Sequence, residues 1–398
     1  FTVNLKAGPV SGTADSINIE LAGAGSGSDI AITDDSATGT LESATINSIS
    51  SANTLTTLGL NGASTLTVTG DQSLTLVQIL EATVTTVDAS GMSGALGLTM
   101  SAEPAAAAIT ITGSAGVDAL VATDTGADNI SAGGGNDTIT FGGDNELNVL
   151  DTVDGGDGED TVTHNEDAIV SSQLGGLSNV EVLKSAVAST ITLNSDVGPT
   201  QFNLANSVND TISFNDDYSQ ATSVSLYADV ASADTITNNA DIALTVIGLS
   251  TDFAADLGTD SVLTITGSAT ATDDLVIYSG GNANIDTNGT PLITNIDNVS
   301  FNSTVGISGS YSPTTSFDFG AYTTPLVVTS NLGILDGALT TDFSGGVTKG
   351  TLTYTGGPGV DVVTGSTLND TITTGAGNDT VTSTSGANTI DTGDGVDI

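Results

Sequence analysis

Residues 356–398 read GGPGVDVVT, GSTLNDTIT, TGAGNDTVT, STSGANTID and TGDGVDI, a nine-residue pattern that repeats without a shift in register. The sixth position of each block is an aspartate or its amide: Asp361, Asp370, Asp379, Asn388 and Asp397. The eighth position of each complete block is apolar: Val363, Ile372, Val381 and Ile390. A strict period with one apolar residue in each block predicts a repetitive structure in which every block folds alike.

The chemistry of the repeat predicts its conformation. Glycines at the first, second and fourth positions permit positive φ, so the chain can turn tightly there. The Asp-x-apolar-x segment that follows forms a short strand with the apolar residue facing inward. Two blocks then make one coil, with a turn on each edge, so Asp361, Asp379 and Asp397 stack on one edge. Asp370 and Asn388 stack on the other edge. We therefore predict an all-β fold, a right-handed parallel β-solenoid or β-roll.

Stacked aspartates require a cation. Strands in neighbouring coils lie about 4.8 Å apart, and two carboxylates at that distance repel by roughly 0.9 kcal/mol even in water. A hard divalent ion held by carboxylate and carbonyl oxygens removes this repulsion, and such ligands at flexible spacing favour calcium over zinc or magnesium. The alternative, a flexible Gly/Asp-rich linker, would not keep an apolar residue every nine positions.

Composition limits the partners of the chain. It has 398 residues, of which 47 are acidic and 3 are lysines, with no arginine and a net charge of -44. Nucleic acid and anionic membrane surfaces need basic patches, so both are excluded as direct partners. No run of 18 apolar residues is present, so we predict no insertion into a membrane. Abundant Thr and Val favour β-structure throughout.

The pattern divides the chain into four segments. Residues 1–112 form a Thr/Ser-rich β-solenoid segment, 113–163 a first calcium-binding block, 164–355 a degenerate β-solenoid segment, and 356–398 a second, truncated calcium-binding block. In the first segment, alternation predicts strands at 45–49, 54–60, 64–68 and 84–88. The alanine-rich run 102–108 is predicted to be a connector or a short helix.

The first block is less regular than the second. Its repeats carry Asp118, Asp128, Asp137 and Asp160, and the second repeat is one residue longer than nine. A degenerate repeat with five extra residues precedes the last one. We expect Asp118, Asp137 and Asp160 to share one edge. Asp128 should share the other edge with Asp144 or Glu146.

The degenerate segment keeps the strands of the repeat but changes its turns. The fragments VNDTISF (208–214), ADTIT (233–237) and DDLVIYS (273–279) retain the Asp-x-apolar pattern without the regular glycines. We interpret them as solenoid coils without a complete metal site. Their acids are therefore expected to face solvent.

Enzyme signatures are missing from the sequence. The one histidine, His164, lies in HNED rather than in the H-E-x-x-H motif of zinc proteases, and we expect it at the surface. Three scattered lysines cannot easily supply the base of a polysaccharide lyase or epimerase. Adjacent residues on a strand face opposite sides, so adjacent acids are interpreted as solvated turns rather than glycosidase pairs. These pairs are Asp34 and Asp35, Asp216 and Asp217, and Asp273 and Asp274.

The two repeat blocks, joined by Thr/Ser-rich strands such as TTVDASGMSGALGLTM (85–100), resemble RTX-type surface-layer proteins of Gram-negative bacteria. The resemblance covers nearly the whole chain and implies type I secretion, calcium-driven folding outside the cell and assembly into a lattice. It also implies Ca²⁺ ligands and turn residues at the following positions: Asp118, Asp128, Asp137, Asp144, Asp157, Asp160, Asp361, Asp370, Asp379, Asn388 and Asp397, with Gly133, Gly135, Gly156, Gly158, Gly359, Gly377 and Gly395.

Two departures from the repeat affect one edge. Asn388 replaces Asp, and Leu368 replaces Gly, so the edge of Asp370 and Asn388 should hold calcium less well. Because the chain starts at Phe1 without Met and stops within a repeat, we expect it to be part of a longer or processed polypeptide.

The expected function is that of a structural, non-enzymatic surface-layer subunit at the bacterial cell surface. Its partners would be calcium ions, other copies of itself, and a cell-surface polysaccharide reached through a domain outside this sequence. The alternative is an RTX adhesin or an extracellular filament module.

Overall fold

The computed structural model describes most of the N-terminal half of the chain and selected strands of the remainder. The described residues are 2–5, 15–34, 41–60, 62–78, 80–101, 104, 108–123, 126–204, 209–226, 234–240, 242–248, 264–267, 273–279, 284–285, 293–294, 298–303, 314–318, 326–331, 338–342, 352–383 and 385–398. Most of the alanine-rich run 102–108 lies outside these residues, so its predicted conformation stays a prediction.

The chain forms two compact units. The first contains Phe1–Ala186 and Val197–Pro199, and the second contains Val187–Asp196 and Thr200–Ile398. The four predicted segment boundaries remain predictions from the sequence.

In the first unit, two parallel sheets alternate along the chain. One has the spatial order β2 (Ser16–Ala22), β4 (Ser43–Ile49), β7 (Thr65–Gly70), β9 (Thr86–Met92), β11 (Thr110–Thr112), β13 (Asn129–Gly134), β15 (Thr152–Asp157) and β18 (Leu177–Ser178). The other has the order β5 (Asn53–Leu55), β8 (Leu74–Leu76), β10 (Leu96–Met100), β12 (Val117–Val121), β14 (Thr138–Phe141), β16 (Thr161–His164) and β19 (Val182–Ser185).

Smaller elements complete the first unit. A three-stranded sheet contains β1 (Thr2–Leu5), β3 (Asp29–Asp34) and β6 (Thr57–Gly59), and the unit also holds β17 (Ala168–Val170) and a short 3₁₀-helix, η1 (Leu174–Gly176). The predicted strands 45–49 and 64–68 lie within β4 and β7. The predicted strand 54–60 is divided between β5 and β6, and β9 begins at Thr86 rather than at 84.

The second unit repeats this arrangement. One sheet has the order β21 (Gln201–Leu204), β23 (Thr222–Leu226), β25 (Leu244–Gly248), β27 (Asp274–Ser279), β30 (Asn298–Ser303), β32 (Leu326–Asn331), β34 (Leu352–Thr355), β36 (Asp370–Thr373) and β38 (Thr389–Asp391). A second sheet contains β20 (Thr190–Leu193), β22 (Thr211–Phe214), β24 (Thr235–Asn238), β26 (Thr264–Thr266) and β29 (Ile293–Thr294). A third contains β28 (Asn284–Ile285), β31 (Thr314–Asp318), β33 (Ala338–Asp342), β35 (Asp361–Thr364) and β37 (Thr380–Thr382).

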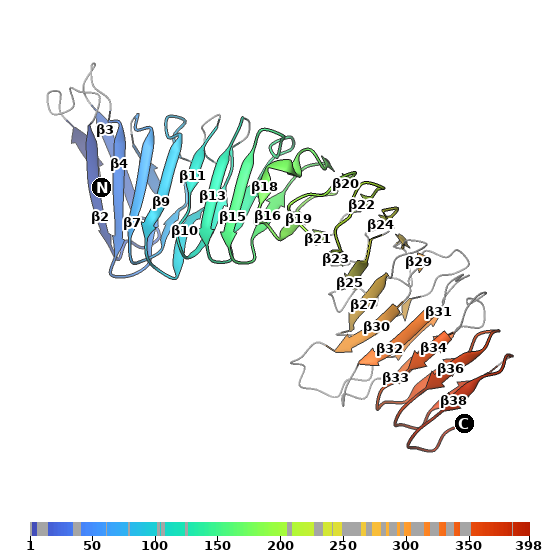
Figure 1. Ribbon diagram of the computed structural model, residues 1–398. Coiled ribbons are helices and arrows are strands. Elements are labelled where there is room, and N and C mark those ends of the chain that lie inside the picture. Colours follow the sequence, from blue (N-terminus) through green and yellow to red (C-terminus); the bar gives the residue numbers. More distant parts are fainter. Residues whose placement is uncertain are drawn as a thin grey trace. The chain divides into compact units, whose positions relative to one another are not determined.

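The fold is an all-β parallel solenoid, as predicted. Consecutive strands belong to different sheets, and each strand pairs in parallel with an equivalent strand of the next coil, as β9, β11 and β13 do within the first unit (Figure 1). In the second block, β34 pairs with β36 and β35 with β37. Two nonapeptides therefore make one coil.

A narrow core of stacked aliphatic side chains fills each coil. In the first unit Ile111, Ile130 and Val153 occupy matching positions in β11, β13 and β15, and each is at most 1% exposed. Full burial of one such side chain contributes roughly 1.5–3 kcal/mol. The outward positions between them are polar, which is the alternation expected of strands with one solvated face. The core thus fixes the register that brings equivalent turn residues together.

Candidate metal centre

Acids at matching positions of successive coils form a hydrogen-bonded series in the first unit. The backbone N–H of Asp118 donates to Asp137 Oδ1 (2.7 Å), and that of Asp137 donates to Asp160 Oδ1 (2.7 Å). The N–H of Asp160 donates to Glu181 Oε2 (2.8 Å). We call this series the first ladder. The prediction that Asp118, Asp137 and Asp160 share one edge is confirmed, and Glu181 extends the series.

The second block has a C-terminal ladder with the 18-residue spacing predicted from the repeat. The N–H of Asp361 donates to Asp379 Oδ1 (2.9 Å), and that of Asp379 donates to Asp397 Oδ1 (3.0 Å). On the opposite edge the N–H of Asp370 donates to Asn388 Oδ1 (2.8 Å). Asn388 therefore occupies a ladder position, and its one side-chain oxygen accepts the ladder hydrogen bond.

The partner predicted for Asp128 in the first block is wrong. The N–H of Asp128 donates to Asp151 Oδ1 (2.9 Å), whereas Asp144 is exposed and Glu146 is buried elsewhere. The insertion 142–150 forms the loop between β14 and β15, so the residue that reaches the ladder position directly precedes β15. Asp144 and Glu146 lie within that loop, and neither shares the edge with Asp128.

Ladders also occur in the degenerate segment, where the acids were expected to face solvent. Asp210, Asp234 and Asp273 are all at most 2% exposed, so that expectation is wrong for them. The N–H of Ser189 donates to Asp210 Oδ1 (2.7 Å), and the N–H of Asp210 donates to Asp234 Oδ1 (2.9 Å). Asp273 accepts the N–H of Leu244 (3.1 Å). The degenerate coils keep the strand register although they lack the turn glycines. This register is sufficient to place the three aspartates in the buried interior.

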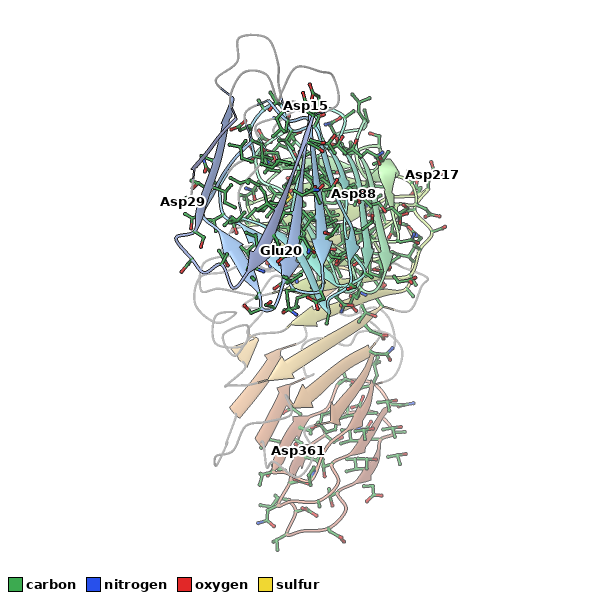
Figure 2. All side chains as sticks on the ribbon, turned by 90° about the vertical axis from the view of Figure 1, so that its left-hand side faces the viewer. Asp15, Glu20, Asp29, Asp88, Asp217 and Asp361 are labelled. Carbon is green, nitrogen blue, oxygen red and sulfur yellow. The ribbon has the colours of Figure 1, made fainter. Side chains whose placement is uncertain are left out.

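Some acids outside the ladders are exposed to solvent. Asp29 and Asp217 are exposed, whereas Asp361 is 1% exposed (Figure 2). Asp216 and Asp217 therefore form a solvated acidic turn, as predicted. The same interpretation is wrong for Asp273, and Asp35 lies outside the described residues.

Glycine turns of successive coils pack closely against one another just before the ladder aspartates. Gly133 and Gly156, four residues before Asp137 and Asp160, have φ of 110° and 101°, which favours glycine. A Cβ on Gly156 would lie 2.0 Å from the carbonyl oxygen of Gly133, so the turns pack without room for a side chain. The other predicted turn glycines with positive φ are Gly135, Gly158, Gly377 and Gly395.

Two predicted turn residues differ from this pattern. Gly359 is not among the glycines with positive φ, so the turn before Asp361 has another conformation from the turn before Asp379. Asp157 is exposed between two turn glycines, and its carbonyl accepts the N–H of Gly135 (2.8 Å). The exposed carboxylate of Asp157 thus lies outside the buried ladder.

Several ladder carboxylates have one oxygen without a hydrogen-bond partner. Oδ2 of Asp137, Asp160 and Asp379 is buried and accepts no hydrogen bond. Burial, together with the charges of Asp118 and Asp160, raises the pKa of Asp137 to about 6. Burial also raises the pKa of Asp160, together with the charge of Glu181. Buried, unsatisfied carboxylate oxygens are costly unless a cation compensates them.

Three other ladder acids, Asp118, Asp128 and Asp370, accept hydrogen bonds from nearby N–H and hydroxyl groups of the protein. Oδ2 of Asp118 accepts the N–H and hydroxyl of Ser114, and Asp370 accepts the N–H and hydroxyl of Ser366. Asp128 accepts the N–H (2.8 Å) and hydroxyl of Thr123. Sequence reasoning missed these hydroxyl donors, because Ser and Thr are common everywhere in the chain. Their signal is a hydroxyl four or five residues before the aspartate, whereas Asp137, Asp160 and Asp379 have glycine four residues before.

The available donor atoms fit a calcium ion held by carboxylate and backbone carbonyl oxygens better than a metal held by several converging side chains. Within the described part of the chain, no group of three or more His, Cys, Asp or Glu side chains converges to hold a metal. The atoms available at the ladders are carboxylate oxygens and the carbonyl oxygens of the glycine turns, which are hard ligands that calcium accepts. Calcium would supply positive charge to the stacked carboxylates, held by Asp137, Asp160 and Asp379.

His164 is a buried residue, so its predicted surface position is wrong. It is fully buried and occupies the same strand position as Phe141 in the preceding coil. Alternation along β16 turns this position inward, as it does for Val162. Nδ1 accepts the N–H of Glu166 (3.2 Å), and burial lowers the pKa of His164 to about 4.

We expect acid to destabilise the calcium-loaded protein through His164. A histidine whose folded pKa of about 4 lies below its usual 6.5 favours the folded state above pH 6.5 and loses this advantage as the pH falls towards 4. At pH 5 the loss is about 2 kcal/mol. His164→Asn keeps an acceptor for the Glu166 N–H but cannot gain a proton. Denaturant unfolding at pH 7 and pH 5 should therefore show a smaller loss in the variant. An equal loss in both proteins would contradict the prediction.

Comparison with known families supports this chemistry. Four copies of the RTX calcium-binding nonapeptide repeat match the chain, at residues 112–145, 151–168, 355–390 and 375–398. Among curated proteins, none matches the sequence significantly. Within the described residues, no helix has the length and apolar character needed to cross a membrane. The matched residues contain both the first ladder's glycine turns and the C-terminal ladder. The chain is therefore a parallel β-solenoid that carries RTX calcium-binding nonapeptide repeats, a motif typical of secreted, extracellular proteins.

Proposed function

We propose that this chain is a structural subunit of a bacterial surface layer, exported by type I secretion and folded by extracellular calcium. The observation that carries the proposal is the buried carboxylate ladder, with unsatisfied Oδ2 atoms on Asp137, Asp160 and Asp379. A chain with 47 acidic residues and 3 lysines cannot neutralise such ladders from its own side chains. Calcium outside the cell can, whereas a calcium-poor cytoplasm leaves the chain unfolded and competent for export.

A structural role fits the repeat better than catalysis. RTX solenoids are usually calcium-binding structural folds. The one histidine is buried with a lowered pKa, so it is poorly placed to act as a general base at an exposed site. The strands instead present polar outward faces in long, regular rows, such as Thr65, Thr86 and Thr110 at matching positions of β7, β9 and β11.

Calcium would act a second time between subunits. A surface this acidic repels its own copies, so lateral packing requires cations that shield or bridge the contacts. Weak contacts can still hold a lattice, because each subunit makes several at once. Asp216 and Asp217 are exposed candidates for such bridges, and the further candidates Asp252 and Asp256 lie outside the described residues.

We expect assembly to need more calcium than folding does. The intersubunit sites use exposed acids, which bind calcium less tightly than carboxylates prearranged by the coils. Calcium titration of one sample, followed by circular dichroism and light scattering, should show scattering rising above the folding midpoint. The double variant Asp216→Asn/Asp217→Asn should shift only the scattering curve.

Images of the calcium-loaded protein identify the assembly. A two-dimensional lattice supports the surface-layer proposal, whereas fibres support a filament module. If the folded protein stays monomeric at high protein and calcium concentrations, an adhesin module replaces the lattice subunit as the preferred function.

A further inference from the structure

We infer that six ladder aspartates of the repeat blocks fall into two classes, only one of which requires calcium. Asp137, Asp160 and Asp379 are the calcium-dependent class. At Asp118, Asp128 and Asp370, a nearby hydroxyl takes the place of the ion. This inference rests on the proposed calcium-dependent function and specifies which residues carry it.

The hydroxyl-capped turns share one hydrogen-bond pattern. The Ser114 N–H donates to Asp118 Oδ2 (2.7 Å), and the Ser366 N–H donates to Asp370 Oδ2 (2.9 Å). In both turns the serine hydroxyl also donates to the aspartate. The same Oγ accepts the N–H two residues later, at 3.0 Å from Gly116 and 3.1 Å from Leu368. Two turns in different blocks thus use an identical bridge, which indicates a defined cap.

Thr123 supplies a third cap by a slightly different route. It lies five residues before Asp128, and its N–H donates to Oδ2 (2.8 Å) while its hydroxyl lies 2.9 Å from Oδ1 and 3.0 Å from Oδ2. Oδ1 of Asp128 also accepts the N–H of Ile109 (2.8 Å). Both carboxylate oxygens are therefore satisfied within the protein, and calcium would have to compete with these donors.

The calcium-dependent class has glycine where the capped turns have a hydroxyl. Gly133, Gly156 and Gly375 lie four residues before Asp137, Asp160 and Asp379, with φ of 110°, 101° and 99°. Glycine has no hydroxyl to donate, and Oδ2 of each of the three aspartates is buried without a hydrogen bond. Within the repeat, the residue at this position therefore decides whether the aspartate oxygen meets a hydroxyl or an ion.

The serine caps lie where the acidic series begins. Asp118 is the first acid of its ladder, and its Oδ1 accepts the N–H of Leu98 from a coil with no acid at that position. Asp370 pairs in register with Leu352, so the coil before it also has no acid at that position. A serine cap therefore lets a calcium-binding coil stack on a coil that has no ligand to share. It also explains why Leu368 is accepted in place of glycine, since the capped turn uses the N–H of Leu368 rather than a left-handed residue.

The test compares Asp→Asn variants of the two classes in the full chain. Asn can hold the ladder hydrogen bond, as Asn388 does (2.8 Å), but lacks the charge that calcium needs. Equilibrium dialysis with calcium should show fewer bound ions for Asp379→Asn than for the unsubstituted chain. Asp370→Asn should keep the full number. The calcium midpoint for folding, measured by circular dichroism, should rise more for Asp379→Asn.

A second pair keeps the test decisive if one variant fails to fold. In the first block, Asp137→Asn should lower the number of bound ions, whereas Asp128→Asn should not.

Ser366→Ala should lower the unfolding temperature at saturating calcium without changing the number of ions. Equal losses in both members of each pair, or the reverse order, would overturn the two classes. If the unsubstituted chain bound no calcium, the proposed calcium role itself would fall, which is a different result from equal losses.

Discussion

Removing calcium with excess chelator is expected to abolish most of the β-sheet circular dichroism of the chain, and millimolar calcium is expected to restore it. The free energy of calcium binding contributes directly to folding, because the turns that form the sites do not exist in the unfolded chain. Without the ion, unsatisfied carboxylates such as Asp137 and Asp379 remain buried against neighbouring acids. A net charge of -44 further favours an expanded chain.

Two controls separate calcium binding from general screening. Sodium chloride at matched ionic strength screens surface charge but cannot occupy the turns. Magnesium at the same concentration tests selectivity, because it demands a smaller, near-octahedral site. Hydrogen exchange should show that strands β12–β16 and β35–β37 lose protection on chelation. A β-sheet spectrum that persists unchanged in excess chelator would refute calcium-driven folding.

The regular part of the site could be predicted from the sequence because one period controlled it. Nine residues for each block and two blocks for each coil place Asp361, Asp379 and Asp397 in one series, and their hydrogen bonds follow that spacing. Counting residues gave the wrong ladder partner for Asp128 in the first block, because the insertion 142–150 interrupts the nine-residue period. Asp151 holds the ladder position there, because position relative to the next strand matters more than the residue count.

Burial in the degenerate segment could not be predicted from turn glycines. Asp210 and Asp234 keep their inward position because the strands that follow them, β22 and β24, stay in register. In the sequence, the inward position of these aspartates is indicated by the apolar residues of the two strands, Ile212 and Ile236, and not by the turn residues. His164 was misassigned for a related reason, since strand alternation rather than polarity decides which side chains face the core.

The roles of Ser114 and Ser366 depend on hydrogen bonds that cannot be predicted from the amino-acid composition. Serine is frequent in this chain, so a serine before an aspartate carries little information by itself. Only the geometry distinguishes a hydroxyl that caps a carboxylate from one that faces solvent. The fourth residue before the aspartate distinguishes glycine turns from serine turns in the sequence, but the hydrogen bonds of each carboxylate oxygen are visible only in the folded structure.

Gly156→Ala is expected to destabilise the calcium-loaded protein strongly. The residue has φ of 101°, and an added Cβ would lie 2.0 Å from the carbonyl oxygen of Gly133 and 2.8 Å from its carbonyl carbon. The left-handed conformation alone costs an L-residue roughly 1–2 kcal/mol. Relief of the overlap must move the backbone of two adjacent turns, so the total loss should be at least about 2 kcal/mol. The calcium midpoint for folding should rise with it, because the displaced carbonyl belongs to the turn before Asp137.

Gly175→Ala is the matched control in the same unit. Gly175 lies in the 3₁₀-helix η1, has no heavy atom within 4 Å of an added Cβ, and is not among the residues with positive φ. Its substitution should change the free energy of unfolding by less than about 0.5 kcal/mol and leave the calcium midpoint unchanged. Denaturant unfolding at saturating calcium, together with calcium titration of both variants, measures the two effects. Similar stabilities and calcium midpoints for the two alanine variants would show that close packing of the glycine turns does not support the site.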